Sequence, residues 1–200
     1  MSVEALDASL REAFGRVVYS HKTHLKEVEQ LNESLDRWKW ARLILLSLTT
    51  GGVITNLVHE TFVVSVFTAL SSSLSLALLI YQLSFNHERA IQDHRRAATR
   101  LWGIREEYEN LIADIKDGGL TEEAARSKRD DITKRLQDIY AECPDTHYKA
   151  YEAARRALKI NEDMTFSAEE VDRFLPVALR RPPTREPLDL PTDIGLQGSL

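Results

Sequence analysis

The stretch FVVSVFTALSSSLSLALLIYQLSF, residues 62–85, contains no charged side chain. A helix needs about 20 apolar residues to cross a hydrocarbon layer of about 30 Å, so this stretch can span a membrane with some tilt. A second apolar stretch, residues 43–58, lies just before it and is shorter. By length alone, this shorter stretch is equally compatible with a membrane span and with a buried helix.

The residues around the shorter stretch favour a membrane span. Trp38 and Trp40 lie where an interfacial aromatic belt is expected, and the side chain of Arg42 can extend back to the lipid headgroups. Only residues 59–61 separate the two apolar stretches, so helices joined there must run antiparallel. The sequence therefore predicts an all-α fold built on a transmembrane hairpin over residues 37–85, with spans at about 38–58 and 62–85.

Basic residues indicate how the hairpin is oriented. They flank it on its two outer sides, at Arg37, Lys39, Arg42, Arg89, Arg95, Arg96 and Arg100. The turn at 59–61 has neither lysine nor arginine. Because positively charged loops stay in the cytoplasm, we expect both termini to be cytoplasmic.

Composition and motifs limit the possible functions. The net charge of −5 argues against direct nucleic-acid binding, which requires clustered lysine and arginine. Cys143 is the only cysteine, so neither a disulfide framework nor a paired-cysteine metal motif is expected. The sequence has no glycine-rich phosphate loop, no HExxH pair and no nucleophile elbow. We therefore expect no enzyme, no cofactor and no catalytic residues, and interpret Glu106, Glu107 and Glu109 as a solvated helix face.

Two apolar stripes with alternating spacings of four and three flank the hairpin. The stripe in the N-terminal cytoplasmic helix, residues 1–36, is Leu10, Phe14, Val17, His21, His24, Val28, Leu31 and Leu35. The stripe after the second span, which we expect to continue as helix to Asp117, is Ala90, His94, Ala97, Leu101, Ile104, Tyr108, Leu111 and Ile115. Such seams predict two packed helices in a cytoplasmic stalk. Folding the chain about its turn places His24 level with Ala97 and within one turn of His94.

His21, His24 and His94 are polar residues inside these apolar seams. The preferred interpretation is that they set the register between the packed helices. A pH-sensing role is the alternative, because histidine titrates near pH 6.5. A metal site would need further ligands that the neighbouring sequence does not supply, so no metal is predicted.

The rest of the cytoplasmic region, residues 86–180, is also expected to be helical. Thr121 begins one helix. Thr146 can cap another helix to about Ile160, along which lie Tyr148, Tyr151, Ala154 and Leu158. Ser167 and Glu170 form a capping box for a short helix through Leu175. Residues 181–200 contain four prolines and little apolar content, which predicts a disordered tail.

Small residues recur at four-residue steps in both spans: Ser47, Gly51 and Thr55 in the first, and Ser65, Ala69, Ser73 and Ala77 in the second. Such faces let helix backbones approach closely. They could pack against each other within one hairpin, or they could join the hairpins of neighbouring subunits. Further hydroxyls at Thr68, Ser71, Ser72 and Ser75 also permit a pore wall.

Several motifs together resemble the SLATT family, the two-transmembrane effector domains associated with SMODS nucleotidyltransferases and SLOG domains. They are HKTH at 21–24, LTTGG at 48–52, HRRAATRLWGIREEYENLIADI at 94–115, RDDITKRLQDIYAECPDT at 129–146, YKAYEAARRALK at 148–159 and EDMTFSAEEVDRFLP at 162–176. The resemblance extends over nearly the whole chain except the tail. It is greatest to a subfamily coupled to reverse transcriptases.

The resemblance implies a multi-pass protein of the bacterial inner membrane that acts in antiphage conflict. It implies a homo-oligomer in the lipid bilayer that forms a pore or disrupts the membrane after activation by a partner or a nucleotide signal. The sensor would be a separate protein of a reverse transcriptase or nucleotidyltransferase system. The alternative is a scaffold without a pore, whose cytoplasmic helices bind a partner protein.

Overall fold

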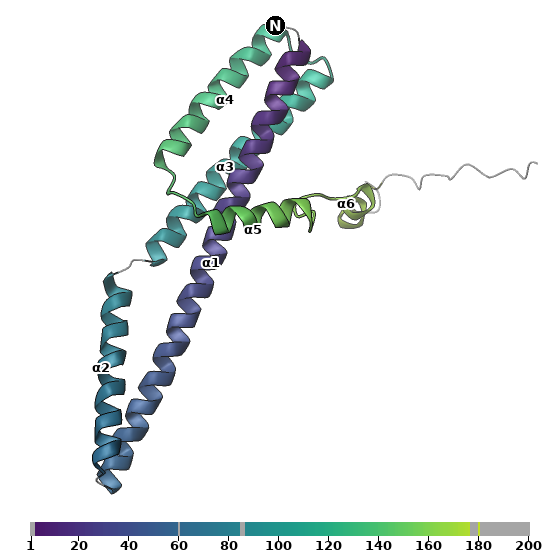
Figure 1. The fold of residues 1–200 in the computed structure, drawn as a ribbon. Coiled ribbons are helices and arrows are strands. Elements are labelled where there is room, and N and C mark those ends of the chain that lie inside the picture. The colour runs from purple at the N-terminus through teal and green to yellow at the C-terminus, as the bar shows by residue number, and fades with distance from the viewer. Residues whose placement is uncertain (1–2, 60, 85–86, 177–179, 181–200) are drawn as a thin grey trace, which may run out of the picture. The chain divides into compact units, whose positions relative to one another are not determined.

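A computed structural model describes residues 3–59, 61–84, 87–176 and 180, and all regular structure in these residues is α-helical (Figure 1). The chain divides into two units, residues 1–161 and residues 162–200. The first unit contains the hairpin and the stalk. The predicted disordered tail, residues 181–200, lies outside the described residues.

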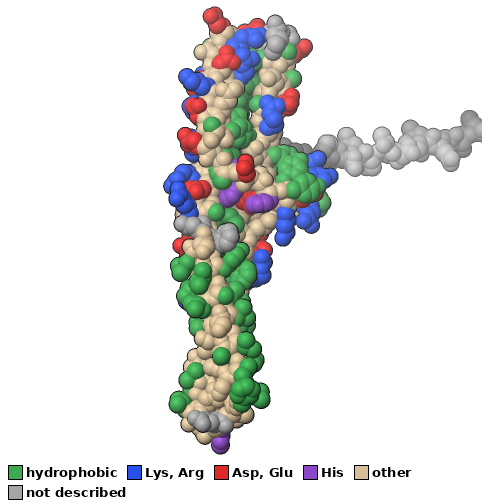
Figure 2. Space-filling model, turned by 60° about the vertical axis from the view of Figure 1, so that its left-hand side comes forward, with side chains coloured by type: hydrophobic (Ala, Val, Ile, Leu, Met, Phe, Trp, Pro, Cys, Tyr) green, Lys and Arg blue, Asp and Glu red, His purple; other side chains and the backbone are tan. Residues whose placement is uncertain are grey.

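The hairpin consists of the C-terminal part of α1 (Val3–Val58) and of α2 (Phe62–Ser84), which run antiparallel from the turn that joins them (Figure 1). α1 is one uninterrupted helix that contains both the N-terminal seam and the first span. Each of the two helices of the hairpin includes an apolar stretch long enough to cross a membrane. In the space-filling view, hydrophobic side chains cover the hairpin, and the Lys, Arg, Asp and Glu side chains lie over the stalk (Figure 2). The predicted all-α hairpin fold is confirmed.

The second arm of the stalk is α3 (His87–Lys116), which follows α2 along the chain. Residues 85–86, through which the sequence predicts continuous helix, lie outside the described residues. α3 ends as expected at a glycine, because Gly118 adopts a positive φ of 70° that other residues rarely tolerate.

The stalk core lies between α1 and α3. The two predicted seams face each other there, and the largest fully buried side chains come from both helices: Leu6, Leu10, Val17, Leu101 and Tyr108. α4 (Glu122–Glu142) adds Ala125, Ile132 and Ile139 to the same core. Its N-cap is the predicted Thr121, whose hydroxyl accepts the Ala124 N–H at 3.3 Å. The heptad seams therefore identify the helix faces correctly.

α5 (Tyr148–Lys159) packs against α1 through a face of small residues. Its buried residues are Ala150, Ala154 and Ala157, whereas Tyr148 is 75 % exposed. Alanine side chains let the two helix backbones approach closely, which a tyrosine face would prevent. The N-cap is His147 rather than the predicted Thr146.

The second unit contains α6 (Ala168–Phe174), which begins with the predicted capping box. The Ser167 hydroxyl accepts the Glu170 N–H at 3.2 Å, and the Glu170 carboxylate accepts the Ser167 N–H at 2.8 Å. Leu175 is the C-cap rather than the last helical residue.

Candidate functional site

The contact between the two spans is formed largely by small and polar residues. The described α1 residues that are turned toward α2 are half-buried: Leu45, Thr49, Gly52 and Asn56. They continue the four-three spacing of the stalk seam into the membrane. Ser71 and Ser75 of α2 are the most buried residues of the hairpin, at 6 % and 9 % exposed. A Cβ atom added at Gly52 would lie 2.1 Å from Thr68 Oγ1. Gly52 is therefore the residue that permits close approach of the two spans.

The small-residue faces that stand out in the sequence lie mostly outside this contact, although the Ser65 hydroxyl donates across it to Asn56 Oδ1 at 3.3 Å. All seven residues are exposed on the hairpin: Ser47, Gly51, Thr55, Ser65, Ala69, Ser73 and Ala77. A Cβ atom at Gly51 would meet nothing within 4 Å. The close approach of the two spans in this hairpin is thus at Gly52 and not at Gly51. A helix turns by about 100° per residue, so adjacent glycines belong to different faces.

The hydroxyls of the exposed faces are satisfied by their own helices. Ser47 donates to the Leu43 carbonyl at 2.9 Å, and Ser73 donates to the Ala69 carbonyl at 2.8 Å. These faces can therefore lie against lipid or another helix without an unsatisfied donor. Ser75 differs, because its Oγ is buried and forms no hydrogen bond with the described part of the chain.

Three histidines lie together in the stalk, between α1 and α3. The Nδ1 atoms of His24 and His94 are 2.9 Å apart, and His21 Nδ1 donates to the Ala98 carbonyl at 2.8 Å. Each ring belongs to a residue no more than 7 % exposed. His24 thus contacts His94, one helical turn from the predicted level at Ala97. We call His21, His24 and His94 the histidine layer.

Glu27 extends this layer to α5, and sequence reasoning missed it. Its side chain is 4 % exposed. It accepts the backbone N–H of His147, and its two carboxylate oxygens lie 3.2 and 3.3 Å from His147 Nδ1. A carboxylate at the start of a helix also stabilises the positive end of the helix dipole. Its position three residues after His24, on the same helix face, was the available signal.

Burial makes the histidine layer resist protonation. It lowers the pKa of His24 to about 4, with a further lowering by His94 and an opposing effect of Glu27. Burial also lowers the pKa of His94, although the nearby Glu27 carboxylate raises it. Burial likewise lowers the pKa of His21, although its hydrogen bond to the Ala98 carbonyl raises it. The layer is therefore neutral at pH 7. An Nδ1–Nδ1 hydrogen bond requires one donor and one acceptor, so it breaks when both rings are protonated.

The histidine layer shows no arrangement suited to a metal ion. Within the described residues, no group of three or more His, Cys, Asp and Glu side chains is placed to hold one. His24 and His94 instead use the facing nitrogens for each other.

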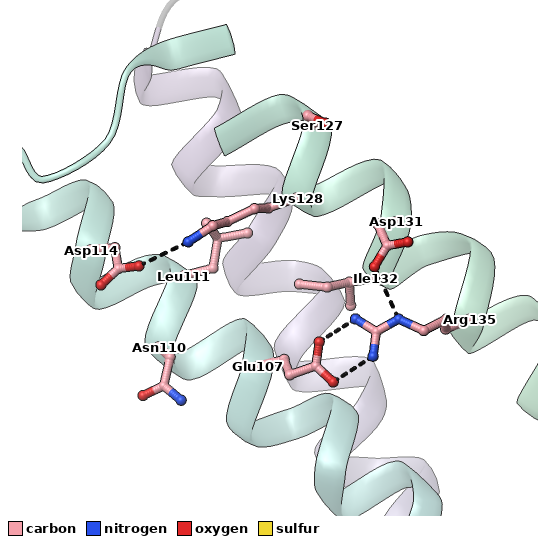
Figure 3. Close-up of a pocket in the computed structure, with 9 residues that line it drawn as sticks. All are labelled: Glu107, Asn110, Leu111, Asp114, Ser127, Lys128, Asp131, Ile132 and Arg135. Atoms are coloured by element: carbon pink, nitrogen blue, oxygen red, sulfur yellow. Dashed lines mark hydrogen bonds and ion pairs between the residues drawn. The ribbon is translucent and has the colours of Figure 1, made fainter. Parts of the chain in front are cut away.

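Between α3 and α4 lies a polar cleft of about 560 Å³ crossed by ion pairs (Figure 3). The Arg135 guanidinium donates two hydrogen bonds to the Glu107 carboxylate, one of them 2.7 Å long. Lys128 Nζ lies 3.3 Å from Asp114 Oδ2. Glu107 thus joins two helices, and Glu106 and Glu109 pair with Arg105 on their own helix. These contacts favour a structural role for the three glutamates.

Comparison with known proteins gives one match. The model of the SMODS and SLOG-associating 2TM effector domain family 4 matches residues 6–170, from the first turns of α1 into α6. No curated protein and no solved structure matches the chain. The matched region contains the complete hairpin and the whole histidine layer. The chain is a membrane protein with a two-transmembrane domain, and it belongs to the SMODS and SLOG-associating 2TM effector domain family 4.

Proposed function

We propose that this protein is a pore-forming effector of bacterial antiphage conflict. Its hairpins oligomerise in the inner membrane and open a water path, or disrupt the bilayer, when a partner protein or nucleotide signal reaches the cytoplasmic helices. One observation carries the proposal. The hairpin makes its internal contact through Gly52 and leaves the small-residue faces of both spans exposed.

These exposed faces suit contacts between subunits. Gly51 and Ala69 lie on them and leave room for a neighbouring helix backbone to approach, as small residues do in membrane helix packing. Two spans are too few to enclose a water path, so a pore requires several hairpins. The hydroxyl-rich interior of each hairpin, including the unbonded Ser75 Oγ, supplies polar groups that a rearranged assembly could turn toward water.

The continuous α1 supports coupling between the stalk and the membrane. Because α1 runs from Val3 to Val58 without interruption, a displacement of its stalk half reaches the first span through one rigid helix. A separate sensor, of the reverse transcriptase or nucleotidyltransferase type, would bind the stalk. The basic residues on both outer sides of the hairpin favour cytoplasmic termini and thus a cytoplasmic signal.

Dye release from lipid vesicles tests the proposal. The full chain, reconstituted at increasing density, should release an entrapped dye, whereas Gly51→Leu and Ala69→Leu should insert but release far less. Leucine favours insertion by roughly 0.3–0.6 kcal/mol, so insertion should survive. Val53→Leu and Val63→Leu enlarge exposed side chains on other faces and serve as matched controls. A scaffold would release no dye at any protein density. Full release by the Gly51→Leu and Ala69→Leu variants would refute the claim that these faces form the contacts between subunits.

A further inference from the structure

A cavity of about 460 Å³ lies where α1, α2 and α3 meet, at the stalk end of the hairpin. Its lining includes Trp38 and Arg42 from α1, Leu83 from α2 and Glu88 from the first turn of α3. The cavity is thus built by all three helices that connect the membrane to the stalk. It lies apart from the small-residue faces and from the histidine layer.

The cavity is at the level of the lipid headgroups. The rings of Trp38 and Tyr81 lie against each other across α1 and α2, with centroids 5.4 Å apart. Such aromatic pairs mark the membrane–water boundary. Leu83, in the cavity wall, is 78 % exposed and extends the apolar surface of the second span. Along the helices, Arg42 and Gln82 line the end of the cavity nearer the membrane, and Leu83 and Glu88 line the end nearer the stalk.

Arg42 is the unusual residue of this cavity. It occupies a seam position, since it continues the four-three spacing of Leu35 and Trp38, and it is half-buried. Among the described residues, no ion pair or hydrogen bond involves Arg42. The neighbouring Lys39 differs, because its Nζ lies 3.3 Å from Asp36 Oδ1. A half-buried guanidinium without a protein partner favours an anion from outside the chain.

Glu88 supplies the opposite charge in the same cavity. Its carboxylate likewise forms no ion pair within the described part of the chain, and it does not pair with Arg42. A ligand with one anionic group alone would satisfy Arg42 and be repelled by Glu88. A ligand with a phosphate and a nearby ammonium group satisfies both.

We infer that this cavity binds the phosphoethanolamine headgroup of a phospholipid. The phosphate accepts hydrogen bonds from Arg42, the ammonium donates to Glu88 on the stalk side, and the acyl chains continue toward the turn along the apolar surface of the two spans. The bound lipid would join the membrane hairpin to the start of α3. The inference does not depend on pore formation.

Fluorescence quenching of Trp38 tests the site in the full chain. In the Trp40→Phe, Trp102→Phe background Trp38 is the only tryptophan. The protein is reconstituted in phosphatidylcholine vesicles that contain bromine-labelled phosphatidylethanolamine or, at the same fraction, bromine-labelled phosphatidylglycerol. We expect labelled phosphatidylethanolamine to quench Trp38 at a lower fraction than phosphatidylglycerol. Soluble phosphoethanolamine and inorganic phosphate, added separately, should leave the quenching unchanged.

Three variants test which side chains contact the lipid headgroup. Arg42→Gln should raise the fraction of phosphatidylethanolamine needed for half-quenching about tenfold, the loss expected for a hydrogen bond to a charged group. Glu88→Gln should abolish the preference over phosphatidylglycerol. Arg37→Gln should change nothing, since this side chain is 70 % exposed and lies near Glu33. Helicity measured by circular dichroism checks that each variant is folded.

Three results would overturn the inference. Equal quenching by both lipids in the wild type would exclude recognition of the ammonium group. Unchanged quenching in a folded Arg42→Gln protein would exclude the phosphate contact. Displacement by soluble phosphoethanolamine or phosphate would show that the cavity takes a free ligand rather than a lipid.

Discussion

Acidification should destabilise the stalk through the histidine layer. The pKa of His24 is about 4 in the folded protein, below the ordinary value of 6.5. Between these two values the unfolded chain binds more protons than the folded chain, so the free energy of unfolding falls as the pH falls. The loss begins near pH 6.5 and is complete near pH 4. The lowered pKa values of His21 and His94 act in the same direction.

The size of the effect follows from the shift at His24. One pKa unit corresponds to about 1.4 kcal/mol, so the His24 term is roughly 3 kcal/mol. The residue is only 4 % exposed, so exposure to solvent calls for no large reduction of this value. The charged groups around the layer modify it. Glu27 and Asp93 favour protonation of His94, whereas His147 opposes it; Lys22 and Arg105 oppose protonation of His21.

Urea unfolding followed by Trp102 fluorescence measures this term. Trp102 lies beside the His21 ring, with centroids 5.3 Å apart, and Trp38→Phe with Trp40→Phe removes the other tryptophans. We expect stability to fall between pH 7.5 and pH 4, and His24→Gln to remove about 3 kcal/mol of that fall. His59→Gln, in the exposed hairpin turn, should leave the pH dependence intact. A fall that is equal in wild type and His24→Gln would refute the reasoning.

Other substitutions and fusions test the remaining contacts. Gly52→Ala should destabilise the hairpin by about 1–3 kcal/mol in detergent thermal melts, because its Cβ would clash with α2, whereas Gly51→Ala should cost little. Glu27→Ala should cost about 1–3 kcal/mol and raise hydrogen exchange in α5, since a buried acceptor at its N-terminus is lost. Deleting residues 182–200 should leave expression and membrane insertion unchanged; loss of either would show that the tail is structural. Reporter fusions at residue 60 and at the C-terminus should report opposite compartments, and a periplasmic C-terminus would refute the orientation.

The sequence identifies the hairpin and both stalk seams because these features are local. An uncharged apolar run determines a span, and the four-three spacing determines which face of a helix is buried. The same spacing, extended past Leu35 through Trp38 and Arg42, also leads to Gly52. The pattern of small residues every four positions led instead to Gly51, because sequence alone does not say which of two adjacent glycines faces the partner helix.

The features that sequence reasoning missed depend on contacts between distant segments. Glu27 looks like an ordinary charged residue of a stalk helix until α5 brings His147 to it. The alanine face of α5 is preferred over its tyrosines because α1 comes close, which the α5 sequence alone does not reveal.

Cysteine crosslinking in native membranes tests the central claim most directly. In a Cys143→Ser background, Gly51→Cys and Ala69→Cys are oxidised singly and when the two variants are co-expressed. Val53→Cys and Leu70→Cys, exposed on other faces, serve as controls. If the small-residue faces join neighbouring hairpins, the Gly51 and Ala69 positions will form intersubunit disulfides in far higher yield than the controls. Equal yields at all four positions, or no disulfide at Gly51 and Ala69, would contradict the proposed assembly.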